Sequence, residues 1–180
     1  MIGVLVSGQG TNLQALLDAG LPVVAVAANR RDAYALERAR EAGVPTATFS
    51  LDCHPDRTER DLLMATWLEE HSVELVVLAG YMHLLTRPFL DRFPDRIVNV
   101  HPSLLPAFPG AHAIADALAA GVATTGVTIH VVDEGLDTGP ILLQERVPVE
   151  PQETLEERIH AVEHRLLPEV VRSLIPVGAR

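Results

Sequence analysis

Short apolar runs alternate along the chain with segments whose apolar residues recur every three or four positions. The runs are rich in Val, Ile and Leu and predict buried strands at residues 2–6, 21–28, 46–49, 74–80, 97–101, 124–132 and 141–149. The periodic segments predict helices that begin near residue 11, cover 33–42, 56–71, 88–91 and 111–120, and begin again at 154. This order predicts one α/β domain with an open, doubly wound, mostly parallel sheet and an antiparallel portion near the C-terminus.

Several helix ends can be predicted from side chains that satisfy backbone groups there. Capping pairs three residues apart are Thr11 with Gln14, Asp56 with Glu59, and Thr154 with Glu157. In the helix after Asp56, we expect Leu62, Leu63 and Trp67 to face the core. Pro168 is expected to kink the last helix or end it early, because proline removes a backbone donor.

The turn after the first predicted strand, Ser7 to Asn12, is rich in glycine and leads directly into a helix. Free backbone N–H groups and the positive end of the helix dipole converge at such a turn and favour an anion. The third glycine of the dinucleotide motif is missing and no Gly-Lys pair follows, so a monophosphate fits best. Asn29, where a dinucleotide enzyme tends to place an acid, supports NAD binding only weakly. A tight turn without any ligand is the alternative.

The stretch VNVHPSLLPAFPG, residues 98–110, begins as a strand and then stops abruptly. Strand alternation points Asn99 and His101 to the same face. The prolines that follow remove backbone donors and stiffen the loop. An amide and an imidazole at the end of a strand in an open α/β sheet indicate a reaction site. The alternative is that both side chains only satisfy nearby backbone groups.

Composition excludes several classes of function. The net charge of −10 argues against a nucleic-acid partner. All 14 basic residues are Arg, which excludes a Schiff-base lysine and the lysine of a phosphate-binding Walker loop. Cys53 is the only cysteine, no basic leader precedes the first strand, and no apolar run approaches ~18 residues. We therefore expect a cytoplasmic protein without a membrane partner.

Two further candidate sites receive little support. Cys53 and His54 resemble a nucleophile with its base, but adjacent residues rarely point at each other and no third group orients them. His101, His112, His130 and Asp137 are possible zinc ligands, but their spacing matches no compact metal motif. No metal is expected, and His130 and His112 are interpreted as supporting residues.

Three motifs together resemble the folate-dependent formyltransferases: LVSGQGTNLQALLDAG near the N-terminus, VNVHPSLLPAFPG, and the later GLDTGP. The likeness runs from about Ile2 to Leu174. The first motif and the final helix are most similar to the branch that acts on glycinamide ribonucleotide in de novo purine biosynthesis. The resemblance implies a Rossmann-like fold with a phosphate-binding half, about 1–98, and a folate-binding and catalytic half, about 99–180. It also implies 10-formyltetrahydrofolate as the formyl-donating co-substrate, small-molecule substrates only, and a monomer or weak homodimer.

The resemblance also assigns residues to roles. The implied catalytic residues are Asn99, His101 and Asp137. Those implied for glycinamide ribonucleotide are Gly10, Thr11, Asn12, His160 and Glu163. Those implied for the folate are Arg57, Met82, His83, Leu84, Leu85, Asn99, Asp133, Glu134, Gly135, Leu136 and Asp137. His83 stands where the family leads us to expect an arginine. A backbone contact there survives the change, but a charge contact to the folate tail is put in question.

These residue types suit direct formyl transfer. When an amine attacks the formyl carbon, the oxygen becomes an oxyanion, and preorganised donors such as an Asn amide and a protonated His commonly contribute ~3–4 kcal/mol each. A nearby carboxylate favours the imidazolium form. Ser103 is interpreted as a hydroxyl that bonds within its loop, not as a nucleophile. Two alternatives stay open: hydrolysis of formyltetrahydrofolate at the same site, and a non-catalytic nucleotide-binding or NAD-binding module.

Overall fold

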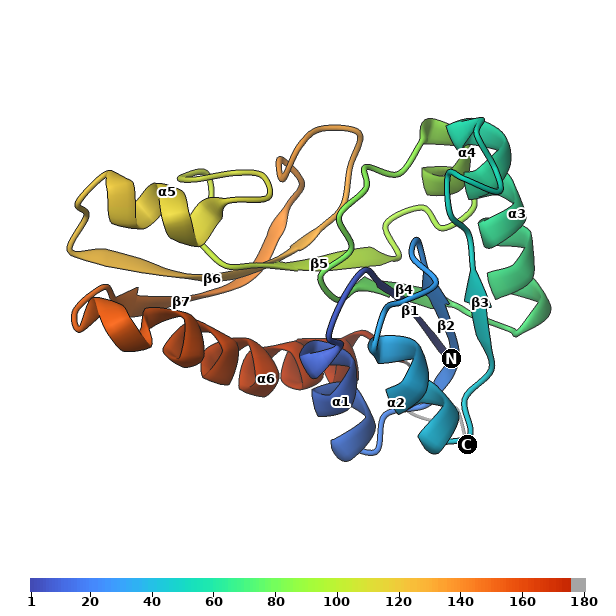
Figure 1. Ribbon diagram of the computed structural model, residues 1–180, viewed down its shortest axis with the longest axis horizontal. Helices are drawn as coiled ribbons and strands as arrows, with labels where there is room; N and C mark the ends of the chain where they lie inside the picture. The colour runs from blue at the N-terminus through green and yellow to red at the C-terminus, as the bar shows by residue number, and fades with distance from the viewer. Residues whose placement is uncertain (176–180) are drawn as a thin grey trace.

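The computed structural model describes residues 1–175, which form a single seven-stranded sheet flanked by helices (Figure 1). The predicted domain ends at residue 180, and its last five residues lie outside the described part. The strands are β1 (Ile2–Val6), β2 (Val23–Ala28), β3 (Thr46–Thr48), β4 (Leu75–Leu78), β5 (Ile97–His101), β6 (Thr124–Val131) and β7 (Ile141–Pro148). The helices are α1 (Thr11–Asp18), α2 (Ala35–Glu41), α3 (Arg57–Glu70), α4 (Arg87–Leu90), α5 (Ala113–Ala119), η1 (Gln152–Thr154) and α6 (Leu155–Leu174).

The strand order is β3-β2-β1-β4-β5-β6-β7. The first five strands of this order are parallel, whereas β6 is antiparallel to β5 and β7 is antiparallel to β6. The prediction of a mostly parallel sheet with an antiparallel C-terminal portion is confirmed. The order of connection reverses between β1 and β4, and open α/β sheets bind ligands at such a switch point.

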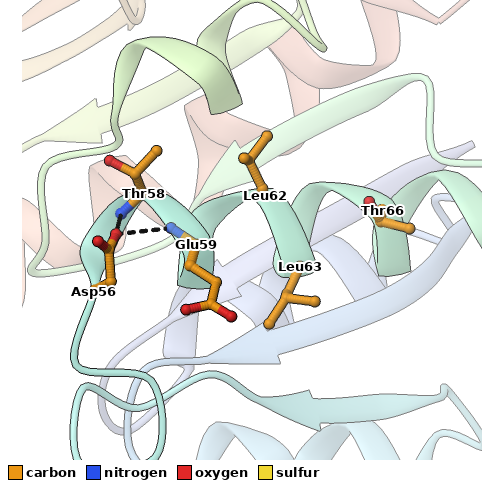
Figure 2. Close-up of a pocket in the computed structure, with 6 residues that line it drawn as sticks. All are labelled: Asp56, Thr58, Glu59, Leu62, Leu63 and Thr66. Carbon is orange, nitrogen blue, oxygen red and sulfur yellow. Dashed lines mark hydrogen bonds between the residues drawn. The ribbon is translucent and has the colours of Figure 1, made fainter.

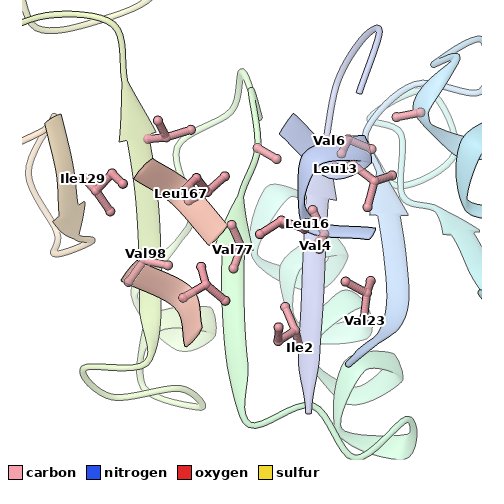
Figure 3. Packing of buried hydrophobic residues seen from close by; sticks show 14 of the residues in the cluster. Ile2, Val4, Val6, Leu13, Leu16, Val23, Val77, Val98, Ile129 and Leu167 are labelled. Atoms are coloured by element: carbon pink, nitrogen blue, oxygen red, sulfur yellow. The ribbon is translucent and has the colours of Figure 1, made fainter. Parts of the chain in front are cut away.

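Two apolar clusters fill the two faces of the sheet. One joins β1, β2, β4, β5 and β6 to α1, α2 and α6, and Figure 3 shows its packing around Val4, Val77 and Leu167. The other lies under α3 and α4 and includes Met64, Phe89 and Ile97. Along β5, Val98 and Val100 belong to the first cluster. Strand alternation therefore places Asn99 and His101 on the opposite face, as predicted.

Helix α6 continues through Pro168 to Leu174, so the predicted early end is wrong. Leu166 and Leu167 before the proline, and Val170 and Val171 after it, are all buried. Burial of this apolar stripe offsets the hydrogen bond that the proline removes. No helix among residues 1–175 is both long and apolar enough to cross a membrane.

Of the three side chains predicted to cap a helix N-terminus, only that of Asp56 does so. The Asp56 carboxylate accepts hydrogen bonds from the N–H groups of Thr58 and Glu59, which confirms that cap (Figure 2). The predictions for Thr11 and Thr154 are wrong. Helix α1 is capped by Gly10 without any side-chain bond. The Thr154 hydroxyl instead bonds to the Pro151 carbonyl and accepts from Arg158.

Helix α3 turns a different face inward from the one predicted. Leu62 and Leu63 are 36% and 43% exposed and line a shallow hollow of about 390 Å³ on the outer surface, shown in Figure 2. Trp67 is half-buried against the core, in agreement with the prediction. The buried residues of the helix are Arg60, Asp61, Met64, Ala65 and Leu68. The charged pair Arg60 and Asp61 thus occupies the buried face that was predicted for the two leucines.

Candidate active site

Three groups of predicted site residues lie at or after the carboxyl ends of neighbouring strands: Gly10–Asn12 after β1, Met82–Leu85 after β4, and Asn99 with His101 on β5. The register pairs Leu5 with Leu78 and Leu78 with Asn99, so the segments that follow these strands leave the same edge. A hydrogen bond of 2.8 Å from the Met82 N–H to Ser7 Oγ joins the segment after β4 to the turn after β1. The switch point of the sheet is thus bridged by a bond between the turn predicted to hold an anion and the segment predicted to bind the folate.

The Asp137 carboxylate meets both polar side chains of β5. Its Oδ1 lies 3.4 Å from Asn99 Nδ2, and its Oδ2 lies 3.5 Å from His101 Nδ1. The backbone N–H of Gly110 donates to Oδ2 at 2.8 Å and fixes the carboxylate. An amide, an imidazole and a carboxylate from separate segments therefore converge as predicted. The Asp137 side chain is only 11% exposed, which strengthens its electrostatic interactions.

His130 on β6 completes this cluster. Its Nδ1 lies 2.9 Å from the Val131 carbonyl oxygen, which can only accept, so Nδ1 carries a proton. Its Nε2 lies 3.5 Å from Asp137 Oδ1, to which it donates when the ring is protonated; in the neutral ring Nε2 is an acceptor. Asn99 Nδ2 lies 3.2 Å from that Nε2. Asn99 Nδ2 therefore lies within hydrogen-bond distance of both His130 Nε2 and Asp137 Oδ1. His130 was interpreted as a supporting residue, and these contacts agree with that role.

The proline-rich loop after β5 orients the His101 ring. His101 Nε2 lies 2.8 Å from the Phe108 carbonyl and donates to it, which leaves Nδ1 facing Asp137. The Ser103 hydroxyl donates to the Ala107 carbonyl at 2.5 Å, which confirms that it bonds within its loop. Thr128 of β6 accepts from the Leu105 N–H and donates to the Ser103 carbonyl. The loop is thus fixed to the neighbouring strand and holds the imidazole in place.

The loop between β6 and β7 depends on one glycine to deliver Asp137. A Cβ on Gly139 would lie 1.9 Å from the Val131 carbonyl oxygen, so only glycine permits this close approach. Asp133 ties the loop together by accepting from the Gly135 N–H and the Thr138 hydroxyl. Glu134 forms an ion pair with Arg87 at the surface. Asp137 itself has a φ of +54°, a conformation that aspartate tolerates better than most residues.

The charge on Asp137 is favoured by its surroundings. Burial alone would raise the pKa of this carboxyl, but His130, the Gly110 N–H and the charge of His101 act against burial and lower the pKa below its ordinary value. The Asp137 carboxyl is therefore ionised at neutral pH and presents its negative charge to His101.

The glycine-rich turn packs too closely for any residue but glycine at position 10. Gly10 has a φ of +73°, and a Cβ there would lie 2.5 Å from the Cβ of Ala35. Because no side chain caps α1, the first N–H groups of the helix remain available to an anion. Thr11 and Asn12 begin the helix at this point. The turn therefore has the backbone geometry that an anion site requires.

Helix α6 reaches the same turn through Glu163. The buried Glu163 carboxylate accepts from Asn12 Nδ2 at 2.9 Å and contacts His160 Nδ1 at 3.0 Å. The bond to Glu163 raises the pKa of His160 above its ordinary value, despite an opposing effect of burial. The Oδ1 atom of Asn12 is buried and has no hydrogen-bond partner among residues 1–175. A buried acceptor without a partner is costly, so this atom is suited to a ligand donor.

The segment Met82–Leu85 forms an exposed apolar wall near these groups. Met82 and Leu84 are 62% and 54% exposed, and Leu136 of the Asp137 loop is 49% exposed. Large exposed apolar side chains beside convergent polar groups are typical of a small-molecule site. Arg57, which is predicted to bind the folate, donates to the Leu84 carbonyl at 2.7 Å and so contacts the Met82–Leu85 wall directly.

Comparison with known proteins identifies the family. The family model described as formyl transferase matches residues 1–171, nearly the whole chain. The chain belongs to the formyl transferase family. Phosphoribosylglycinamide formyltransferase of Mycobacterium tuberculosis is 49% identical over 97% of this chain and 85% of its own length. The trifunctional purine biosynthetic protein adenosine-3 of Gallus gallus is 42% identical over 99% of this chain, but over only 18% of its own length.

Solved structures agree with this assignment. Phosphoribosylglycinamide formyltransferase from Streptococcus pneumoniae superposes with a TM-score of 0.92 at 45% identity and covers 96% of this chain and 97% of its own. Glycinamide ribonucleotide transformylase 1 from Geobacillus kaustophilus gives a TM-score of 0.93 at 44% identity, with coverages of 97% and 98%. The fold of this formyl transferase is that of its relatives.

Two charged residues of this formyl transferase were missed by the sequence analysis. Arg60 and Asp61 lie completely buried beneath the Met82–Leu85 wall, although charged residues on a helix usually face solvent. No signal in the sequence distinguishes them from the exposed charges of the same helix. Within residues 1–175, no group of three or more His, Cys, Asp or Glu side chains is arranged to hold a metal. The thiol of Cys53 accepts from Arg31, a contact that does not involve the base suggested by its neighbour His54.

Proposed function

We propose that this formyl transferase moves the formyl group of 10-formyltetrahydrofolate to the amine of glycinamide ribonucleotide. The observation that carries the proposal is the convergence of Asn99, His101 and Asp137 at a sheet edge that also holds the glycine-rich turn before α1. The names of its relatives, which are phosphoribosylglycinamide formyltransferases, support the same substrate.

The amine substrate fits the turn after β1. Its phosphate would be held by the free N–H groups of Gly10, Thr11 and Asn12, where the helix dipole adds favourable charge. His160 and Glu163 lie beside Asn12 and would contact the ribose and glycinamide part. The raised pKa of His160 keeps this imidazole more protonated than an ordinary one, which suits an anionic substrate.

The folate would lie against the Met82–Leu85 wall, with the loop from Asp133 to Asp137 on its other side. The exposed side chains of Met82, Leu84 and Leu136 offer apolar surface to a flat ring. Backbone groups of the wall and of the Asp137 loop would supply hydrogen bonds. This position would bring the formyl carbon to Asn99 and His101 on β5, which lies between β4 and β6 in the sheet.

Formyl transfer then needs no covalent enzyme intermediate. The amine lone pair forms a bond to the formyl carbon while the carbonyl electron pair moves to oxygen. The Asn99 amide exchanges one of its present acceptors for this oxyanion, and the His101 imidazolium, favoured by Asp137, neutralises its charge. The bond between carbon and the folate nitrogen then breaks. The proton lost by the amine is passed to that nitrogen by water, or by His101 once its Nε2 exchanges the Phe108 carbonyl for the substrate.

The proposal is tested by mixing protein, 10-formyltetrahydrofolate and glycinamide ribonucleotide and following the release of tetrahydrofolate with and without the amine. We expect release only when the amine is present, in step with formation of the formylated amine. Equal release without the amine would identify a hydrolase. Absence of release under both conditions, together with nucleotide binding at the glycine-rich turn, would identify a non-catalytic module.

A further inference from the structure

Arg60 and Asp61 form an ion pair with no exposed surface under the Met82–Leu85 wall. Both Nε and Nη2 of Arg60 donate to Asp61 Oδ1, at 2.9 and 2.6 Å, and both side chains are 0% exposed. A buried ion pair is expensive to desolvate and is often no more stable than an apolar replacement. Its presence under this wall therefore calls for a function other than stability.

Arg60 and Asp61 each contact the segment Met82–Thr86 that lies above them. The free oxygen of Asp61, Oδ2, accepts the backbone N–H of Thr86 at 2.8 Å. The remaining nitrogen of the guanidinium, Nη1 of Arg60, lies 2.7 Å from Nδ1 of His83. With Arg57 on the Leu84 carbonyl and Ser7 on the Met82 N–H, polar contacts hold four of the five residues from Met82 to Thr86.

The contact with Arg60 fixes the protonation state of His83. A guanidinium has only donors, so Nδ1 of His83 must be unprotonated and the proton of a neutral ring must lie on Nε2. The groups that face this imidazole are Arg57, Arg60 and Asp61 of α3 and the edge of the Tyr81 ring, whose centroid is 5.9 Å away. Burial, followed by the charges of Arg60 and Arg57, lowers the pKa of His83.

We propose that Arg60 and Asp61 are positioning residues for the formyl donor, and that they hold the Met82–Thr86 segment in its donor-binding conformation only while His83 is neutral. The inference rests on the proposed function, since it requires this segment to bind the folate. A proton on Nδ1 would face the Arg60 guanidinium, which Asp61 prevents from turning away. The family resemblance predicts an arginine at position 83. In this chain the positive charge is instead that of Arg60, which lies beneath the segment and contacts it through the neutral imidazole of His83.

The state of His83 can be measured without any substrate, by recording the ¹⁵N chemical shifts of its ring as a function of pH. We expect the tautomer protonated at Nε2 at neutral pH and a pKa below the ordinary value. The substitution Arg60→Lys, which keeps a cation for Asp61 but is too short to make both contacts, should raise that pKa, whereas Arg40→Lys on the exposed face of α2 should not. A proton on Nδ1, or a pKa unaffected by Arg60→Lys, would overturn the inference.

Donor binding provides the second measurement, with tetrahydrofolate as the probe and tryptophan fluorescence or calorimetry as the readout. His83→Leu removes the acceptor, and we expect tetrahydrofolate to bind about tenfold more weakly, as for loss of one hydrogen bond to a charged group. His83→Asn offers Arg60 an acceptor that does not titrate, so it should recover most of the affinity. It should also abolish the loss of affinity that wild-type protein shows as pH falls through the pKa of His83.

These measurements distinguish a failure of the positioning role from a failure of the proposed function. If wild-type protein binds tetrahydrofolate but His83→Leu binds it equally well, or if His83→Asn keeps the acid loss of affinity, the positioning role is wrong and the proposed function stands. If neither wild-type nor variant protein binds tetrahydrofolate at any pH, the proposed function is wrong and the positioning role falls with it. In catalysis, His83→Leu should raise KM for the donor more than it lowers kcat, and leave KM for the amine unchanged.

Discussion

Asp137→Asn is the substitution that most directly tests the catalytic arrangement. The carboxylate lies 3.5 Å from His101 Nδ1, and two unit charges at that distance interact by about 5 kcal/mol at an effective dielectric constant of ~20. An amide removes this charge and also turns a donor toward Asn99 if it keeps its bond with the Gly110 N–H. Because 1.4 kcal/mol corresponds to a factor of ten in rate, we expect kcat to fall by roughly two to three orders of magnitude.

The assay is tetrahydrofolate release under saturating donor and amine, with circular dichroism to show that the variant is folded. Asp116→Asn, an exposed carboxyl on α5, is the matched control and should retain wild-type kcat. If folded Asp137→Asn keeps kcat within tenfold of wild type, the carboxylate does not support His101 and the reasoning from this cluster is refuted.

Three further predictions concern the phosphate-binding turn, helix α6 and helix α3. Gly10→Ala should lower the free energy of unfolding by at least ~2 kcal/mol and raise KM for the amine substrate, because of its positive φ and the contact with Ala35; a stable variant with unchanged KM would contradict this. Glu163→Gln should lower the pKa of His160, measured by NMR, since Glu163 is the main cause of its elevation. The contribution of protonated His160 to binding is lost as pH rises through its folded-state pKa, so amine binding in Glu163→Gln should fail at a lower pH than in wild type; an unshifted profile would exclude this role. Leu68→Ala should cost about 2–5 kcal/mol of unfolding free energy and Leu63→Ala less than ~1, as measured by urea denaturation; equal losses would mean that the described face of α3 is wrong.

The sheet could be predicted because its signals are local. Strands buried on both faces read as continuous apolar runs, and β5 carries Asn99 and His101 to one face through the two-residue period alone. The second strand begins at Val23 and not at Leu21, because Pro22 between them has no N–H for the ladder. The glycine-rich turn before α1 could be predicted for the same reason, since its glycines and its position between a strand and a helix are both local features.

The meeting of Asp137 with β5 could not be predicted from local pattern. Asp137 is 38 positions from Asn99 and reaches it through a loop whose path depends on the close approach of Gly139 to Val131. Only the family resemblance placed the three side chains together. The buried face of helix α3 was predicted wrongly for a different reason. Leu62 and Leu63 are as apolar as the residues that are buried, so hydrophobicity does not distinguish them. Arg60 and Asp61 are suited to the interior only when they are paired with each other.

The hydrogen bond between Met82 and Ser7 has a consequence for how the two substrates meet. It connects the segment proposed for the donor to the turn proposed for the phosphorylated amine, across the switch point of the sheet. Any shift that one ligand imposes on its own segment alters the strength of this bond and so the affinity of the other. Thermodynamic linkage makes the effect mutual, so whatever factor the amine applies to donor affinity, the donor must apply to amine affinity.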